Sequence, residues 1–287
     1  MSARPEDIDL DLNCSITLNG IAYSANTEET ILEFSKRIGI EIPHLCYKEG
    51  MRPDGNCRVC VVEIEGERTL QPSCVRKVSD GMVINTHNDR VLHSQKVVIE
   101  LLQSDVSKDV YDPNSELKHW SDKLNVQETR FPSKVQNKHD LSHPAIAVNL
   151  DACIQCTRCV RACREEQVND VIGYAQRGLA SEIVFDLDDP MGTSTCVGCG
   201  ECVQACPTGA LMPSKEVGQV IPDKKVESVC PYCGVGCLLT FNIKDDKILF
   251  AEGRDGPANM SRLCVKGRYG FNYVNSEQRL TVPLARK

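Results

Sequence analysis

The sequence has few aromatic residues, no long apolar run and no excess of basic residues, and each shortage excludes a class of protein. Aromatic residues make up only 5% of the 287 residues, so a large aromatic core is not expected. The apolar stretches are far too short to cross a bilayer, which predicts no membrane insertion. Acidic residues outnumber basic ones by 40 to 33, for a net charge of −7, and no arginine-rich stripe occurs. We therefore expect no nucleic-acid partner.

Sequence motifs for substrate chemistry are also missing. There is no Gly-x-Gly-x-x-Gly, no phosphate-binding loop and no Ser-His-Asp arrangement. No catalytic residue is assigned, and whether the chain is an enzyme in its own right stays open. The polar, acidic start of the chain shows no signal core and no twin arginine, so we expect a cytoplasmic protein. Thiols stay reduced in that compartment, where many cysteines indicate metal rather than disulfides.

Cysteine is the abundant residue, with seventeen copies, and sixteen of them form four quartets. Thiolates are soft ligands that hold iron and sulfide, and closely spaced cysteines wrap one cluster without strain. Four clusters in a chain of this size predict electron conduction. In chain order the quartets are Cys46, Cys57, Cys60 and Cys74; Cys153, Cys156, Cys159 and Cys163; Cys196, Cys199, Cys202 and Cys206; and Cys230, Cys233, Cys237 and Cys264.

Residues 14–86 predict a β-grasp ferredoxin domain. Asn19-Gly20 between two short apolar stretches is a strong signal for a two-residue hairpin. A helix is expected to follow, capped by Thr27 and ended by Gly39. A cysteine loop, a strand beginning at Val59 and a last strand from Met82 complete the pattern. Because four cysteines lie on this pattern, we expect a [2Fe–2S] cluster there, with a zinc loop as the alternative.

Three further regions follow. Residues 87–144 predict a helix over Asn88–Ser104, with Val91, Leu92, Val98, Leu101 and Leu102 on its apolar side, and then a polar linker. Residues 145–215 hold the two middle quartets and predict a double [4Fe–4S] ferredoxin domain. Residues 226–287 predict a small β-rich domain around the last quartet, with strands at Leu238–Ile243 and Lys247–Glu252. The expected fold class is α+β.

The two middle quartets repeat the run Cys-x2-Cys-x2-Cys-x3-Cys of two-cluster ferredoxins, in which the fourth cysteine of each run binds the other cluster. We therefore assign one [4Fe–4S] cluster to Cys153, Cys156, Cys159 and Cys206. The other is assigned to Cys196, Cys199, Cys202 and Cys163. Pro207 follows the second run as expected, whereas Arg164 occupies that place in the first. Two zinc knuckles are the alternative.

The last quartet also predicts a [4Fe–4S] cluster. Lys266 lies two residues beyond Cys264, where its ammonium group could approach the cluster and an anionic cofactor; an ordinary solvated lysine is the alternative. Cys14 is left over and is expected to be a plain strand-edge residue. The expected complement is one [2Fe–2S] and three [4Fe–4S] clusters, with no flavin or pterin bound by this chain alone.

These motifs resemble known iron–sulfur proteins. The first domain resembles the N-terminal [2Fe–2S] domain of the large iron–sulfur subunit of respiratory complex I, of NAD-dependent hydrogenases and of formate dehydrogenases. The segments Cys230-Pro-Tyr-Cys-Gly-Val-Gly-Cys and Leu263-Cys-Val-Lys-Gly-Arg-Tyr-Gly are similar to the start of the catalytic part of formate dehydrogenase alpha subunits. The resemblance implies a bis-pterin molybdenum or tungsten cofactor beside the fourth cluster, with Lys266 between the two.

Two departures from that family shape the functional expectation. The family carries a further cluster with one His and three Cys after the first domain, but no cysteine lies between Cys74 and Cys153. The chain also stops at Lys287, so we expect the pterin-binding catalytic domains to be absent. The resemblance implies an NADH-oxidising flavin subunit and a separate catalytic subunit as partners, as in a split formate dehydrogenase. The alternatives are a relay in a flavin-based bifurcating or low-potential reductase, for example of the benzoyl-CoA reductase type, and a free-standing polyferredoxin.

Overall fold

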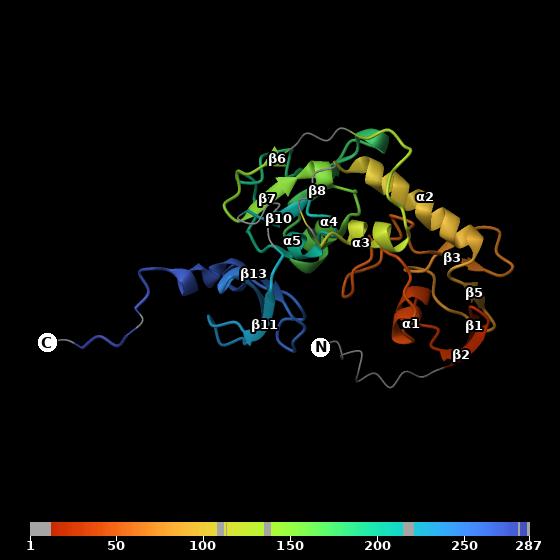
Figure 1. Cartoon of the computed structure of the whole chain (residues 1–287), viewed down its shortest axis with the longest axis horizontal. Helices are drawn as coiled ribbons and strands as arrows, with labels where there is room; N and C mark the ends of the chain where they lie inside the picture. The colour runs from red at the N-terminus through yellow and green to blue at the C-terminus, as the bar shows by residue number, and fades with distance from the viewer. Residues whose placement is uncertain are drawn as a thin grey trace. The chain divides into compact units, whose positions relative to one another are not determined.

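The computed structural model describes residues 13–107, 112, 114–134, 139–214, 221–280 and 282–285. The chain forms two compact units. The first consists of residues 1–104 and 116–132, and the second of residues 105–115 and 133–287. Figure 1 shows the elements of both units, which are treated separately below. In the described part of the chain, no helix is long and apolar enough to cross a membrane.

The first unit is built on a five-stranded sheet in the order β2-β1-β5-β3-β4. Strand β1 pairs antiparallel with β2 and parallel with β5, and β3 pairs antiparallel with both β5 and β4. Helix α1 contributes Ile31, Leu32 and Phe34 to the core beneath the sheet. The bounds are β1 Cys14–Leu18, β2 Ile21–Ala25, α1 Ile31–Arg37, β3 Val61–Ile64, β4 Gln71–Pro72 and β5 Val83–Asn85.

The predicted hairpin is present, but the predicted helix cap is wrong. Asn19 and Gly20 have φ of 52° and 82°, the left-handed pair that a two-residue hairpin turn requires. Helix α1 is capped by Thr30 rather than Thr27. Thr30 accepts a hydrogen bond from the backbone N–H of Glu33 at 3.2 Å, and the Glu33 carboxylate accepts the Thr30 N–H at 2.9 Å. This reciprocal capping box satisfies two orphan donors, which a cap at Thr27 would not.

Helices α2 (Asp89–Asp105) and α3 (Glu116–Lys123) follow in the chain. The long helix was predicted, and most of its predicted apolar side is buried or partly buried, including Leu92, Val98 and Leu102. Val91, Gln95 and Ile99 are buried, whereas Leu101 is 44% exposed. A buried glutamine breaks the apolar pattern because its amide donates to the Val61 carbonyl at 3.1 Å. The sequence therefore predicted the helix and most of its buried side, but not the burial of a polar residue.

Residues 139–214 of the second unit hold the two middle quartets. Strands β6 (His139–Asp140), β7 (Ile146–Asn149) and β10 (Leu211–Pro213) form one small sheet, and β8 (Ile172–Ala175) pairs with β9 (Glu182–Phe185) in a hairpin. Helices α4 (Arg158–Arg161) and α5 (Glu201–Ala205) pack against each other, as Figure 1 shows. A π-helical turn at Ala162–Glu166 extends α4. Short 3₁₀ turns cover Leu150–Ala152 and Gly178–Ala180.

The last part of the second unit is an antiparallel sheet of β11 (Lys224–Val229), β12 (Leu238–Lys244) and β13 (Lys247–Gly253). Strands β12 and β13 lie where the sequence predicted strands, and β11 was not predicted. Asp245 and Asp246, both at positive φ, make the turn between β12 and β13. Helix α6 (Val265–Tyr269) and a 3₁₀ turn at Gly270–Asn275 complete the described elements. Small sheets with short helices agree with the predicted α+β class.

Candidate metal centres

The first quartet lies in the first unit, in the loops on both sides of β3. Cys46, Cys60 and Cys74 are buried and Cys57 is partly exposed. The backbone N–H of Cys46 donates to the sulfur of Cys57 at 3.4 Å. Hydrogen bonds from Cys57 and Cys74 hold the pKa of Cys46 down to about 2, and a hydrogen bond from Cys74 lowers the pKa of Cys60. Cys46 thus lies within hydrogen-bonding reach of Cys57 and Cys74, and Cys60 of Cys74, and the same hydrogen bonds raise the pKa values of Cys57 and Cys74.

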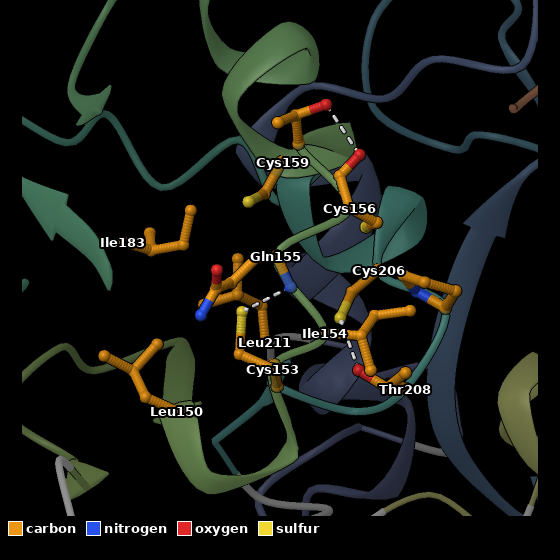
Figure 2. Close-up of a pocket in the computed structure, with 13 residues that line it drawn as sticks. Leu150, Cys153, Ile154, Gln155, Cys156, Cys159, Ile183, Cys206, Thr208 and Leu211 are labelled. Carbon is orange, nitrogen blue, oxygen red and sulfur yellow. Dashed lines mark hydrogen bonds between the residues drawn. The ribbon is translucent and has the colours of Figure 1, made fainter. Parts of the chain in front are cut away.

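The second site gathers residues from both middle runs. Cys153, Cys156, Cys159 and Cys206 line one small cavity of about 20 Å³, shown in Figure 2. Its other walls are largely apolar and include Leu150, Ile154, Ile183 and Leu211. The structure therefore brings together the cysteines that the crossed assignment grouped, three from one run and the last from the other.

The loop of this second site is shaped by unusual backbone conformations. Gln155 and Thr157 have φ of 55° and 66°, which turn the chain back so that the cysteines on either side face the same space. The N–H of Gln155 donates to the sulfur of Cys153 at 3.4 Å, drawn dashed in Figure 2. Burial raises the pKa of Cys153 to about 12. In the metal-free chain this thiol therefore keeps its proton at neutral pH.

The third site has the reciprocal composition. A thiolate at Cys163 would raise the pKa values of both Cys196 and Cys202, although burial is the larger cause at each. The sulfur of Cys163 accepts from the N–H of Val171 at 3.4 Å, and that of Cys196 accepts from the N–H of Gly198 at 3.4 Å. Cys163 thus lies near two cysteines of the other run.

The π-helical turn explains how the first run tolerates Arg164 where the second has Pro207. The turn carries Cys163, and its N–H bond from Gln167 to the carbonyl of Ala162 spans five residues at 3.1 Å. A π turn is wider than an α turn and inserts one residue. A proline after Cys163 would remove a backbone donor within that turn.

The fourth site is the most exposed. Cys230 and Cys237 are partly exposed and Cys233 and Cys264 are exposed. Burial raises the pKa of Cys237, and thiolates at Cys230, Cys233 and Cys264 would raise it further, so the four cysteines lie near one another. The Cys230 N–H donates to the carbonyl of Cys237 at 2.8 Å and closes the loop.

Lys266 has a partner at this site. Its Nζ lies 5.3 Å from the centre of the Tyr232 ring, a cation–π contact. Tyr232 itself lies between Cys230 and Cys233, so the ammonium group is held beside the cysteine loop. The structure thus places Lys266 next to the fourth quartet.

Among the described residues, no group of three or more His, Cys, Asp or Glu side chains has the geometry of a single-ion site. In a [4Fe–4S] cluster each of the four thiolates binds a different iron, whereas in a [2Fe–2S] cluster two thiolates bind each iron. Backbone N–H groups donate to sulfur in three of the sites, at Cys57, Cys153, Cys163 and Cys196. Such donors stabilise thiolate ligands and tune cluster potentials.

Sequence reasoning did not single out Glu201, Gln204 or Arg268, which lie beside the third and fourth quartets. Arg268 donates to Glu201 at 2.6 Å, and both side chains are buried. The two residues are 67 positions apart, so no local spacing or periodicity marks them. A charged residue two positions after Cys199 is no stronger a signal than any solvated acid.

Comparison with protein-family models divides the chain into iron–sulfur domains. A 2Fe-2S iron-sulfur cluster binding domain matches residues 13–89. The ferredoxin-like domain of NADH-quinone oxidoreductase subunit 3 matches residues 143–212. The molybdopterin oxidoreductase Fe4S4 domain matches residues 223–276. The chain is therefore a multi-domain iron–sulfur protein with domains of both the 2Fe-2S and the 4Fe-4S type.

Whole-chain relatives narrow the class. The probable oxidoreductase YjgC of Bacillus subtilis (strain 168) is 32% identical, over 95% of this chain and 32% of its own length. A subunit of an NADH-quinone oxidoreductase of Rhizobium meliloti (strain 1021) is 31% identical, over 95% and 33%. A putative formate dehydrogenase of Staphylococcus haemolyticus (strain JCSC1435) is 30% identical, over 95% and 32%. More particularly, then, the chain is homologous to this NADH-quinone oxidoreductase component and to formate-dehydrogenase-like proteins.

The chain spans about a third of the length of these relatives. A solved structure shows the same fold. A chain of an NAD+-reducing [NiFe]-hydrogenase in the H2-reduced state aligns with a TM-score of 0.67 and 24% identity, over 74% of this chain and 92% of that one.

Proposed function

We propose that the chain is an electron-transfer subunit of a larger oxidoreductase and that each quartet holds one cluster. One [2Fe–2S] cluster is assigned to the first quartet, and [4Fe–4S] clusters to the second, third and fourth sites. The observation that carries the proposal is that cysteines from two separate runs line one cavity at the second site. Cys206 of the second run lies there with Cys153, Cys156 and Cys159 of the first. The corresponding domains are residues 14–86, 145–215 and 226–287, with residues 87–144 as helix and linker.

The bound clusters would supply sites that accept and donate single electrons. The residues of the chain determine where those sites lie and how they are insulated. The apolar wall of the second site excludes water from the sulfurs of Cys153 and Cys156. Backbone donors to sulfur would stabilise the more negative, reduced form of a bound cluster and so raise its reduction potential. No residue of the chain is assigned a role in substrate chemistry.

The proposed partners lie at opposite ends of the domain order. We assign an NADH-oxidising flavin subunit to the first domain and a separate catalytic subunit to the last. The names of the relatives support this assignment, because they include a subunit of an NADH-quinone oxidoreductase and putative formate dehydrogenases. We expect the complex to be cytoplasmic and this chain alone to bind neither flavin nor pterin.

The surroundings of the fourth quartet support a partner at that end. Val235, Val265 and Tyr232 are 57%, 47% and 38% exposed and lie within the two segments that carry the cysteines. Apolar side chains gathered around exposed ligands are typical of a surface that another protein covers. Lys266, beside Tyr232, is assigned to an anionic cofactor of that partner.

Anaerobic purification of the native complex through a tag on this chain tests the proposal, with metal, flavin and pterin analysis and identification of the subunits. We expect about fourteen iron atoms per chain, from one two-iron and three four-iron clusters. Molybdenum or tungsten with pterin at one per chain would support the formate dehydrogenase type. Flavins without stoichiometric pterin would support the flavin-driven reductase instead. A stable chain with no co-purifying subunit would contradict both.

A further inference from the structure

A buried guanidinium group connects the third and fourth cluster sites. Arg268 lies on α6, the helix that begins directly after Cys264. Its Nε donates to the carbonyl oxygen of Cys199 at 2.8 Å, and one Nη donates to the carboxylate of Glu201 at 2.6 Å. The other Nη donates to the side-chain oxygen of Gln204 at 2.7 Å. One side chain from the fourth site thus binds three groups on the ligand segment of the third.

Glu201, on the segment of the third site, contacts the segment of the fourth site in turn. The carboxylate oxygen that accepts from Arg268 also accepts the backbone N–H of Leu263 at 3.0 Å. Glu201 precedes Cys202 in the chain, and Leu263 precedes Cys264. One carboxylate oxygen of Glu201, next to Cys202, is therefore hydrogen-bonded to the backbone of Leu263, next to Cys264.

Gln204 adds contacts to the end of β13. Its side-chain nitrogen donates to the carbonyl oxygens of Gly253 and Ser261, at 3.2 and 3.1 Å. Its side-chain oxygen accepts the N–H of Gly253 at 3.1 Å. Gln204 lies on α5 with Cys202, so the same helix is bound to two separate places in the last domain.

The Arg268 side chain is tightly packed against the loop that carries Cys199 and Cys202. A Cβ on Gly200 would lie 2.2 Å from Cδ of Arg268, so only glycine lets the arginine approach the loop between Cys199 and Cys202. The Arg268 and Glu201 side chains are only 4% and 10% exposed. Removing one partner of a buried, hydrogen-bonded ion pair leaves an uncompensated buried charge, so the two side chains hold each other in place.

We propose that Arg268 is a positioning residue that fixes the separation of the third and fourth cluster sites, so that they act as one rigid step in the electron path. The inference rests on the proposed function, because it requires clusters at both quartets. Arg268 ligates neither cluster. Its planar fork reaches Cys199, Glu201 and Gln204 at once, which the single ammonium group of a lysine cannot do.

The test compares the parent chain, reconstituted anaerobically with iron and sulfide, with the Arg268→Gln, Glu201→Gln double variant. The double variant removes both charges together and so strands no buried carboxylate. Iron per chain and the electron paramagnetic resonance spectrum of the fully reduced protein are measured. Spin–spin interaction between reduced clusters falls with the inverse cube of their separation and reports position directly. We expect unchanged iron and a loss of the interaction assigned to the third and fourth clusters.

Arg164→Gln is the matched control. Arg164 follows Cys163, a ligand of the same third cluster, but pairs with Asp170 at 2.6 Å on its own segment. This variant removes a positive charge beside the same cluster without touching the last domain, so its spectrum should match that of the parent. A change in Arg164→Gln as large as in the double variant would indicate a charge effect and would overturn the inference.

If the double variant loses iron, the Arg268→Lys variant tests the positioning role instead. It retains the positive charge but not the fork, so positioning predicts normal iron with weakened spin–spin interaction. A parent-like spectrum in Arg268→Lys, or in a double variant that keeps its iron, would overturn the inference. A parent chain that binds no iron would contradict the proposed function as well, whereas a loaded parent without this interaction would contradict only the positioning role.

Discussion

The side-chain amide of Gln95 donates to the carbonyl oxygen of Val61 at 3.1 Å, which ties the long helix to the strand that follows the Cys57–Cys60 loop. Gln95 is only 1% exposed. Removing the Gln95 amide leaves the buried carbonyl oxygen of Val61 without this hydrogen-bond donor. We expect Gln95→Leu to lower the free energy of unfolding of the first domain by about 1–3 kcal/mol.

Denaturant unfolding, followed through the visible signal of the [2Fe–2S] cluster in the iron-loaded chain, measures the change. Exposed Lys96→Ala is the control, and an equal effect there would contradict the prediction.

Thr30 caps α1, and its substitution separates the observed cap from the one that the sequence suggested. Thr30→Ala removes the acceptor of the Glu33 N–H. We expect a loss of about 0.5–2 kcal/mol in unfolding free energy. Thr27→Ala should change stability by less than about 0.5 kcal/mol, because Thr27 lies outside the helix. Paired thermal unfolding of the two variants checks this, and a larger loss at Thr27 would show that the cap has been misassigned.

Cluster loading at the second site should depend on pH. The thiolate is the form that binds iron, yet burial raises the pKa of Cys153 to about 12 in the metal-free chain. This raised pKa stabilises the metal-free fold below the ordinary thiol pKa of about 8.5, and that contribution is lost as the pH rises through about 12. Loading must expel the proton, so it becomes more favourable as the pH rises from 6 to 9. Proton release during anaerobic reconstitution measures this. A chain that binds iron equally well at pH 6 and 9 would contradict it.

The first quartet is proposed as the point of electron entry. Cys57→Ser should lower iron by about two atoms per chain and leave the other three clusters in place. In the complex it should also block reduction of the [4Fe–4S] clusters by NADH. Cys14→Ser is the control, since Cys14 lies on β1 outside the quartets and donates to the Ala25 carbonyl at 3.3 Å. Normal NADH-linked reduction in a Cys57→Ser chain that lacks the two-iron cluster would place electron entry elsewhere.

The cysteine spacing and the local turn signals predicted much of this architecture, because both depend on neighbours in sequence. Asn19-Gly20 predicted a hairpin from backbone sterics alone, and the two repeated cysteine runs predicted the crossed grouping at the second site. The burial of Gln95 on α2 was not predicted, because it depends on a hydrogen bond to a carbonyl group 34 residues away. The Arg268–Glu201 pair could not be predicted either, because its two residues are far apart in the sequence. Its two members meet only after the domains fold, and each alone resembles a surface charge.

The exposure of Cys233 and Cys264 gives the fourth site a different chemical lifetime from the others. Oxidants modify cysteine sulfur in proportion to its accessibility, while Cys60, Cys74 and Cys153 are buried in the fold. Air should therefore damage the last domain of this protein first. A preparation aged in oxygen is expected to keep iron at the first quartet longer than at the fourth, the site that the proposed function places beside the catalytic partner.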